Sequence, residues 1–299
     1  METPALLPGT GPGTTMLLIH AHPDDETIVT GATMAAAAAA GTRVVLLSCT
    51  RGELGEVIPP ELAHLEVKAP HLAHDAGAAQ ESAASLGAGL ARERERELAA
   101  ALQALGVTDH LWLGRGATAP ASGELTFRDS GMKWGPEGRA TAADTVLPGS
   151  FSRAPLKQLA PLLAQAVRTL RPEVVISYAA DGGYGHPDHV RAHQMTMAAL
   201  PLAAAPGPGS GAVAAPGWRV PHVYAIVSDR PERPLAAGAP RIAVQGDVAA
   251  KTAAMRAHRT QITVKGGSFA LSNNQWHEIS AVEEFTPVDP YAPHGLQGP

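Results

Sequence analysis

The chain has 299 residues, of which 45% are hydrophobic, and its formal charge is −5 without a long basic block. This apolar content can bury a substantial core in one large domain. The charge gives no electrostatic footprint for nucleic acid or an anionic membrane, and no apolar run reaches the roughly 20 residues that cross a bilayer. Composition therefore favours a cytoplasmic protein that acts on a small molecule, with no nucleic-acid or membrane partner.

Short apolar runs alternate with longer helical patterns, which is typical of a parallel sheet with crossover helices. Apolar runs predict buried strands at residues 16 to 20, 43 to 49, 110 to 113, 173 to 178 and 222 to 228. Helices are predicted at about residues 26 to 40, 79 to 105, 155 to 170, 188 to 200 and 248 to 258. We expect an α/β fold: a Rossmann-like, doubly wound, mostly parallel sheet with helices on both faces and the functional site at the carboxyl ends of its strands.

A few segments break this rhythm. Residues 114 to 154 form a long polar, glycine-rich connection, and residues 203 to 217 have the composition of a flexible surface loop. Residues 1 to 14 and about 286 to 299 are predicted to be flexible tails. The pattern contains no internal repeat, so we expect a single domain. Cys49, the one cysteine, lies in an apolar run and is predicted to be buried.

The stretch HPDDE, residues 22 to 26, follows the first predicted strand and carries more ionisable groups than a turn needs. A helix start explains the proline and one aspartate, because acidic side chains cap free N–H groups and favour the positive end of the helix dipole. His20, His22 and the second aspartate stay unexplained. Strand alternation points His20 away from His22, so we expect His20 to be a core or supporting residue rather than a ligand.

A second cluster follows the strand predicted at residues 173 to 178 and packs His186, Asp188 and His189 into four residues. Because the carboxyl ends of parallel strands share one edge of a sheet, the two clusters can converge on one point. A divalent metal explains both compositions, since zinc binds imidazole nitrogen and carboxylate oxygen.

Spacing suggests which residues bind this metal. His22 and Asp25 lie three residues apart across a strand-to-helix turn, and His189 can supply a third ligand from the neighbouring turn. We expect these residues to bind one Zn²⁺ per chain, with Fe²⁺ as the alternative metal. Asp24 is then spare, and a spare carboxylate can accept a proton from a water whose pKa the metal lowers from 15.7 toward 7.

These motifs resemble those of a known family. AHPDDE and GGYGHPDHV are similar to motifs of the zinc-dependent deacetylases that include the glucosaminyl-phosphatidylinositol deacetylases and the LmbE-like proteins. The blocks HAHPDDETIVTGATMA, SCTRGELGEVI, ELAAALQALGV, FRDSGM, RPEVVISYAADGGYGHPDHV and ALSNN resemble its mycothiol-biosynthesis branch, which removes acetyl from N-acetylglucosaminyl-inositol. The resemblance spans most of residues 16 to 275 and is poor at residues 60 to 80 and 203 to 217 and in the C-terminal tail.

The resemblance implies a role for each matching position. The positions that match the zinc ligands and the general base are His22, Asp25, His189 and Asp24. His186 matches a general acid or oxyanion donor, Tyr184 matches a mobile tyrosine that reaches the oxyanion, and Asp188 matches a partner that tunes the histidine. The positions that match contacts to the sugar and inositol are Glu56, Arg94, Asp129 and Met132.

Three of these residues also have plain structural interpretations. Arg94 lies in RERERE, whose alternating charges can form a solvated helix face. Asp129 precedes Ser-Gly and can be an ordinary turn residue, and Tyr184 in GGYG can be a turn aromatic.

The resemblance implies an enzyme that hydrolyses a linear amide, with N-acetylglucosaminyl-inositol as the expected substrate. Deacetylation of N-acetylglucosaminyl-malate and cleavage of mycothiol S-conjugates are the nearest alternatives, although the conjugate amidases carry lysine where this chain reads TIVTG. An iron oxygenase shares the two-histidine, one-carboxylate ligand set but leaves Asp24 idle. A non-catalytic metal- or sugar-binding protein likewise has no use for a base. The oligomeric state stays open.

Overall fold

The computed structural model describes residues 6–67, 86–135, 139–207, 215–228, 235 and 238–292. Among these residues, the main sheet has seven strands in the order β3-β2-β1-β6-β7-β12-β8. Its parallel strands are β3 (Asp109–Trp112), β2 (Arg43–Ser48), β1 (Thr15–His20), β6 (Val174–Tyr178) and β7 (His222–Ile226). At one end, β12 (Val282–Pro287) pairs antiparallel with both β7 and β8 (Ile242–Gln245).

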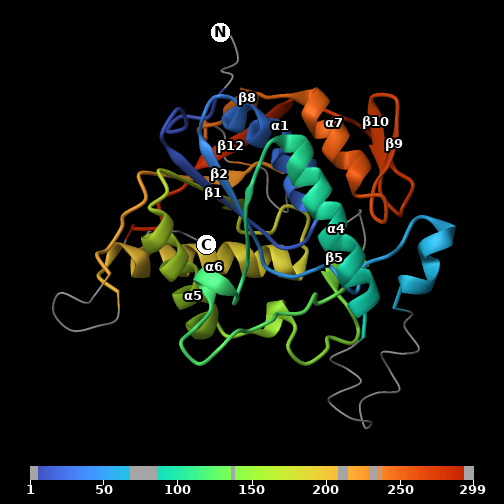
Figure 1. The fold of residues 1–299 in the computed structure, drawn as a ribbon, viewed down its shortest axis with the longest axis horizontal. Helices are drawn as coiled ribbons and strands as arrows, with labels where there is room; N and C mark the ends of the chain where they lie inside the picture. The colour runs from blue at the N-terminus through green and yellow to red at the C-terminus, as the bar shows by residue number, and fades with distance from the viewer. Residues whose placement is uncertain are drawn as a thin grey trace.

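Helices cover both faces of this sheet. On one face α1 (Asp25–Ala39), α4 (Ala88–Leu105) and α7 (Val248–Ala257) contact one another, and on the other α5 (Leu156–Leu170) packs along α6 (Pro187–Ala204) (Figure 1). The two groups face opposite ways because the chain winds outward from β1 in both directions and crossovers between parallel strands are right-handed. The prediction of a doubly wound α/β fold is confirmed.

The strand order reverses between β1 and β6, which are neighbours although 158 positions separate the last residues of the two strands. A crevice forms at such a reversal, outside the carboxyl ends of the two strands. His20 ends β1 and Tyr178 ends β6. The two polar clusters of the sequence therefore meet at this crevice.

Each of the five predicted strands corresponds to an observed parallel strand. The predicted helices correspond to α1, α4, α5, α6 and α7, although residues 79 to 85 of the second prediction lie outside the described residues. The elements that the sequence patterns miss are short: β8, β12, β4 (Met132–Trp134), β5 (Ala140–Ala142), β9 (Thr263–Lys265), β10 (Ser268–Ala270), β11 (Trp276–Glu278), and the 3₁₀ turns η1 (Pro60–Leu65), η2 (Gly116–Thr118) and η4 (Phe151–Arg153).

The described parts of the two predicted tails contact the body of the protein. Leu7 is only 1% exposed and belongs to the main hydrophobic core. Near the other end, the hydroxyl oxygen of Tyr291 accepts the amide hydrogen of Val220 at 2.9 Å. The connection at residues 114 to 154 is also partly structured, because it contains η2, η4 and the β4–β5 hairpin. Apolar side chains hidden in otherwise polar segments anchor these stretches.

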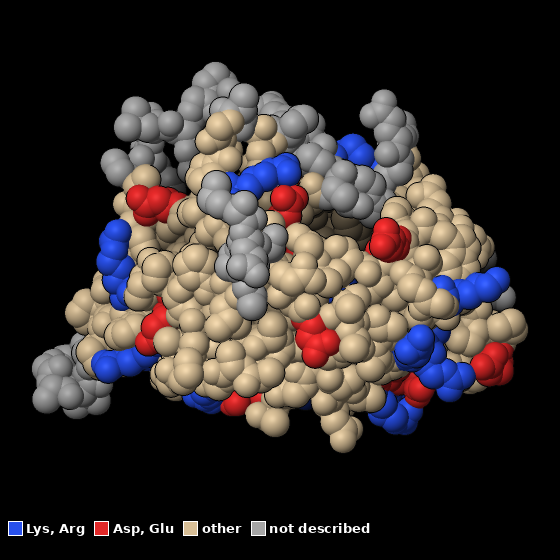
Figure 2. Space-filling view, turned by 90° about the horizontal axis from the view of Figure 1, so that it is seen from above, with Lys and Arg blue, Asp and Glu red and all other residues tan. Residues whose placement is uncertain are grey.

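The core lies on both sides of β1, whose residues Met16 to Ile19 are fully buried. Burying each such side chain contributes about 1.5–3 kcal/mol. Cys49 is buried in the same core, as predicted. No helix in the described part of the chain is long and apolar enough to span a membrane. On the face seen in Figure 2, basic and acidic side chains are interspersed.

Candidate metal centre

The turn after β1 brings His22 and Asp25 together. The chain leaves the sheet at His20, and α1 begins at Asp25. Oδ2 of Asp25 accepts the amide hydrogen of His22 at 2.9 Å and lies 3.2 Å from Nδ1 of the same histidine. The hydroxyl of Tyr178, at the end of β6, donates to the same carboxylate oxygen at 2.8 Å. Asp25 is thus fixed from both neighbouring strands.

The turn after β6 is glycine-rich and folds closely onto the start of α6. A Cβ on Gly182 would lie 2.8 Å from the amide nitrogen of Val190 and 2.9 Å from Cβ of His189, and its φ is 68°, so only glycine fits there. The carbonyl oxygen of Gly182 consequently reaches Nδ1 of His189 at 3.1 Å. His186 is the N-cap of α6, and its Nδ1 accepts the amide hydrogen of Asp188 at 3.2 Å.

Two ring nitrogens, one of His189 and one of His22, face the carboxylate of Asp25. Nδ1 of His189 donates to Gly182, so its Nε2 carries a lone pair, and this buried Nε2 has no hydrogen bond and lies 3.2 Å from Oδ1 of Asp25. Nε2 of His22 lies 3.2 Å from Oδ2 of Asp188, and Nδ1 of His22 lies 3.2 Å from Oδ2 of Asp25, so carboxylates flank both nitrogens of this ring. The lone pair of His189 Nε2 thus faces a carboxylate oxygen without a hydrogen between them, and a cation bound to both atoms would satisfy them. The donor set fits a divalent metal.

Other side chains of the cluster lie equally close. In the described part of the chain, ligand atoms fall within 4.8 Å of one another in two sets: His22 with His186 and His189, and His22 with Asp129 and Asp188. Burial lowers the pKa of His22, but the carboxylates of Asp129, Asp188 and Asp25 outweigh it and hold that pKa well above 6.5. This excess of negative charge favours a bound cation.

Asp24 takes no part in this hydrogen-bonding pattern. Its backbone has φ 113° and ψ −36°, a conformation that costs an L-residue about 1–3 kcal/mol. Asp24 occupies the N-cap position of α1, but its side chain makes no capping hydrogen bond there and instead lines the cavity. Burial and the neighbouring Asp25 carboxylate raise the pKa of Asp24 to about 8.

His186 and Tyr184 lie beside the histidine pair. The ring centroid of His186 is 4.6 Å from that of His22 and 4.7 Å from that of His189. Burial, followed by the His22 and His189 rings, holds the pKa of His186 well below 6.5. Tyr184 lies with its ring centroid 5.2 Å from His189 and stacks on Trp134 of β4 at 5.9 Å. Both residues line the cavity.

Asp188 differs from its expected role. Only its backbone N–H contacts His186, whereas its carboxylate contacts His22. The same carboxylate accepts from the amide of Ser130 at 2.9 Å and from the Ser130 hydroxyl at 2.5 Å. Asp188 is fully buried. The histidine that this aspartate orients is therefore His22.

The four expected substrate contacts all line a cavity of about 1020 Å³ at the crevice, but they differ in character. Arg94 is 4% exposed and donates to the carbonyl oxygens of Gly52 and Glu56, so the interpretation as a solvated helix residue is wrong. The side chain of Glu56 is exposed at the rim and accepts the hydroxyl of Ser272. Arg94 therefore supports the loop that presents Glu56.

Asp129 is both a turn residue and a neighbour of the metal centre. Its Oδ1 accepts the amide of Gly131 at 2.8 Å and lies 3.7 Å from Nε2 of His22. Its own amide donates to Glu53 at 3.2 Å.

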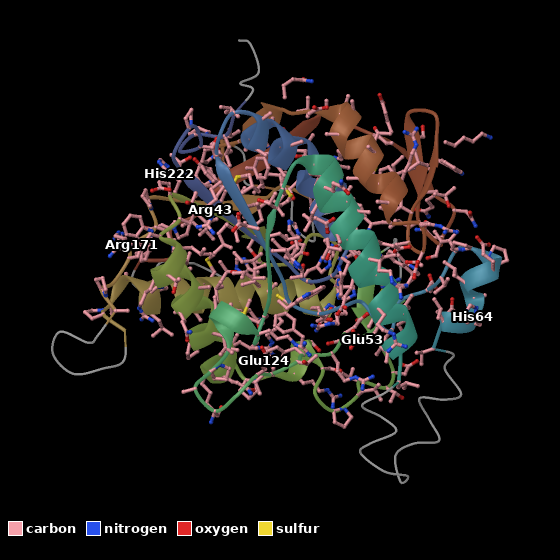
Figure 3. All side chains as sticks on the ribbon, in the orientation of Figure 1. Arg43, Glu53, His64, Glu124, Arg171 and His222 are labelled. Carbon is pink, nitrogen blue, oxygen red and sulfur yellow. The ribbon has the colours of Figure 1, made fainter. Side chains whose placement is uncertain are left out.

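Figure 3 shows Glu53 near one end of α4 and His64 on η1 at the edge of the molecule. Met132 begins β4 and is partly buried in the cavity wall.

Sequence patterns miss several residues of the site. Tyr178 ends an apolar strand, where its hydroxyl accepts the amide of Ala21 at 2.9 Å and donates to Asp25. Its position directly before the second cluster was the available signal. His20 lies 3.2 Å from this hydroxyl and 3.0 Å from that of Thr30, away from the ligand atoms, as strand alternation predicts. Trp134, which lines the cavity and stacks on Tyr184, lies two residues after Met132, and no other feature of the sequence indicated that it belongs to the site.

Comparison with known proteins assigns the family. The family model described as GlcNAc-PI de-N-acetylase (PIG-L) matches residues 17–200. The chain belongs to this family. Among curated relatives, a "1D-myo-inositol 2-acetamido-2-deoxy-alpha-D-glucopyranoside deacetylase" of Kineococcus radiotolerans is 45% identical, over 83% of this chain and 69% of its own length. A protein of Catenulispora acidiphila with the same name and the number 2 is 40% identical, over 90% and 87%. The resemblance to the deacetylases is confirmed.

Solved structures show the same fold at low identity. N,N'-diacetylchitobiose deacetylase from Pyrococcus horikoshii has a TM-score of 0.52 at 18% identity, covering 83% of this chain and 70% of its own. The zinc-inhibited form of a teicoplanin deacetylase has a TM-score of 0.53 at 18% identity, covering 92% and 97%. A 4-carboxy-2-hydroxymuconate hydratase from Pseudomonas putida has 0.51 at 17% identity, covering 95% and 99%. Because a hydratase shares the fold, the fold alone does not determine the activity.

Proposed function

We propose that this member of the PIG-L family is a metal-dependent N-deacetylase that hydrolyses the acetamide of N-acetylglucosaminyl-inositol to acetate and a free amine. The observation that carries the proposal is the buried Nε2 of His189, which has no hydrogen bond and faces the carboxylate of Asp25, with Nδ1 of His22 on the other oxygen of that carboxylate and Asp24 in the adjoining cavity wall. Relatives that are 45% and 40% identical carry the name of this activity.

His22, Asp25 and His189 are the proposed ligands, and Zn²⁺ is the proposed metal because the set contains imidazole and carboxylate donors. A divalent metal in this position supplies a Lewis acid for the acetamide carbonyl and lowers the pKa of water. The hydroxyl of Tyr178 donates to Asp25, and the carboxylate of Asp188 contacts His22, so each of these two ligands is held in place by a neighbour. Such supporting contacts orient ligands and keep them basic.

The chain's own residues move the protons. Asp24 faces the cavity next to the ligands and accepts a proton from the attacking water. Nδ1 of His186 accepts from the Asp188 amide, so Nε2 carries the ring proton and is the donor available to the oxyanion. Tyr184, two residues earlier in the same loop, supplies a second donor, its hydroxyl. Loss of one such donor lowers kcat by about 10²–10³-fold in other hydrolases.

The cavity favours a polyhydroxylated aglycone over a dicarboxylate. Each lysine and arginine that lines it in the described part of the chain already has a partner. Arg94 donates to backbone carbonyls. The remaining basic residues pair with carboxylates: Lys133 with Asp144, Arg241 with Glu284 and Lys251 with Glu283. Malate would need unpaired cations, whereas inositol hydroxyls can donate to exposed carboxylates such as Glu56.

Two assays test the proposal. Purified protein loaded with zinc is given N-acetylglucosaminyl-inositol and N-acetylglucosaminyl-malate side by side, and released acetate is quantified. We expect clear preference for the inositol conjugate, and preference for malate contradicts the substrate assignment without affecting the metal centre. In parallel, metal content is measured for His189→Ala, which should lose most of its metal. Full occupancy in that variant contradicts the ligand assignment.

A further inference from the structure

The unusual backbone of Asp24 has a visible cause. Only three non-glycine residues in the described part of the chain have positive φ, namely Asp24, Arg171 and Asn274. The other two, at 49° and 54°, lie in the left-handed helical region, whereas Asp24 at 113° lies outside it. The amide hydrogen of Asp24 is donated to Oε2 of Glu26 at 3.0 Å. This hydrogen bond to the side chain of Glu26 thus holds the Asp24 backbone at its positive φ.

Glu26 is itself held by partners that leave it little freedom. Its Oε1 accepts from the hydroxyl of Thr27 at 2.6 Å and from Nε2 of His258 at 2.8 Å. Glu26, Thr27 and His258 are each 0% exposed. A fully buried carboxylate whose two oxygens are both engaged cannot rotate without losing hydrogen bonds. The carboxylate is therefore a rigid anchor behind Asp24.

His258 comes from a part of the chain outside the matched family region. It is the C-cap of α7 and lies beyond residues 17–200. The next residues tie the same segment to α4, because the amide and hydroxyl of Thr260 donate to Glu97 at 2.8 and 2.7 Å. The C-terminal third of the chain consequently supports the turn that carries the base.

We propose that Glu26, held by His258, is a positioning residue for the base: its carboxylate keeps the Asp24 backbone in the conformation that turns the Asp24 side chain into the cavity. This inference rests on the proposed function for its kinetic readout. Without the acceptor, Asp24 relaxes toward an ordinary negative φ, and its carboxylate moves away from the attacking water. Misplacement of a catalytic group by about 1 Å can cost roughly 10²-fold in rate.

The test compares Glu26→Leu, which removes the acceptor, with Glu26→Gln, which keeps one oxygen for the Asp24 amide. Each metal-loaded variant is assayed for kcat, KM and metal content. We expect Glu26→Leu to lower kcat by roughly 10- to 100-fold with KM and metal content unchanged. Glu26→Gln should retain more of the activity. Glu97→Gln is the matched control, because it removes a buried carboxylate tied to the same segment without contacting Asp24, and its kcat should stay near the wild-type value.

A double variant separates positioning from stability. Replacing a buried ion pair by apolar residues is often neutral, whereas removing one partner is costly. Glu26→Leu/His258→Leu should therefore regain melting temperature relative to Glu26→Leu and keep the low kcat. Recovery of kcat together with stability overturns the proposal. Wild-type kcat in Glu26→Leu, or an equal loss in Glu97→Gln, overturns it as well. Should Glu26→Leu not fold, His258→Leu, which removes one of the two donors to Oε1 of Glu26, is judged by the same criteria.

Crystallography gives a readout that does not depend on activity. In the Glu26→Leu variant the φ of Asp24 should leave the value near 113°. An unchanged φ overturns the positioning role. If metal-loaded wild-type protein releases no acetate, the proposed function fails, and the φ of Asp24 in the variant still decides this inference.

Discussion

Asp188 contacts the candidate metal centre through His22. Its carboxylate is fully buried, contacts Nε2 of His22 and is held by Ser130. A carboxylate behind a histidine ligand fixes the ring and raises its basicity, and removing such a partner typically costs 10–100-fold in metal affinity.

We therefore expect Asp188→Asn to weaken metal binding by about 10- to 100-fold, measured by competition with a chromophoric chelator. Ser130→Ala serves as the comparison, because the backbone amide of residue 130 still holds the carboxylate, and its loss should be smaller. Wild-type affinity in Asp188→Asn would show that His22 needs no such support.

At the scale of elements, α1 is clamped against the β8–α7 connection. A Cβ on Gly246 would lie 2.2 Å from the carbonyl carbon of Ala32 in the middle of α1, and the amide of Asp247 donates to the Ala32 oxygen at 3.0 Å. Glu283 of β12 adds to the clamp, because its carboxylate accepts the amides of Ala32 and Thr33 at 3.1 and 2.8 Å. The helix that begins with Asp25 is positioned by these contacts.

Gly246→Ala should accordingly lower the free energy of unfolding by about 1–3 kcal/mol or more, since the added methyl overlaps helix backbone. Urea unfolding measures the change. Gly267→Ala is the matched control, because a Cβ there meets no atom within 4 Å, and it should leave stability nearly unchanged. Equal midpoints for the two variants would contradict the close packing of α1 on this connection.

The contact between His258 at the end of α7 and Glu26 in α1 also makes the free energy of unfolding depend on pH. Burial lowers the pKa of His258, but the carboxylates of Glu26, Asp24 and Glu97 outweigh it and raise that pKa above 6.5. A raised folded-state pKa gives stability that is fully present below pH 6.5 and is lost as the pH rises through the folded value.

The free energy of unfolding should therefore decline on the alkaline side of pH 6.5 in wild-type protein, and less so in His258→Gln. Urea titrations at a series of pH values, with metal held constant, give both curves. Parallel curves for the two proteins would assign the decline to other groups.

Sequence patterns predict the parts of the fold in which one signal dominates. The five parallel strands are buried on both faces and are therefore nearly continuous apolar runs. Strand β12, with sequence VEEFTP, has no such run, and its glutamates pair with other elements, so its place in the sheet depends on contacts distant in the sequence. The three-residue strands β9, β10 and β11 are too short for a periodic signal.

The candidate site divides in the same way. His22, Asp25 and His189 lie in the turns and first helical turns that follow β1 and β6, so motif and topology together predict that they converge. Supporting contacts are harder to predict, because Glu26 and His258 lie 232 positions apart and neither belongs to a pattern that points to the other. The exchange of partners at Asp188, from His186 to His22, depends on a side-chain direction that spacing does not determine.

For the whole molecule, metal binding should appear as folding stability. A ligand that binds only the folded state stabilises it by about 2.7 kcal/mol when its free concentration is 100 times Kd. Removing the metal with a chelator should therefore lower the melting temperature by roughly 4 °C in a chain of this size, because the unfolding entropy is about 2.1 cal/mol/K per residue. Asp24→Asn should keep this shift, and His189→Ala should lose it. A shift of equal size in His189→Ala would contradict its place among the ligands.

The most direct test of the central claim is turnover in Asp24→Asn measured together with its metal content. Zinc-loaded wild-type protein should release acetate from N-acetylglucosaminyl-inositol, and Asp24→Asn should hold a full equivalent of metal and lose most of its kcat. Near-normal kcat in that metal-loaded variant would contradict the account, because the carboxylate that the bent backbone turns into the cavity would then have no part in the reaction.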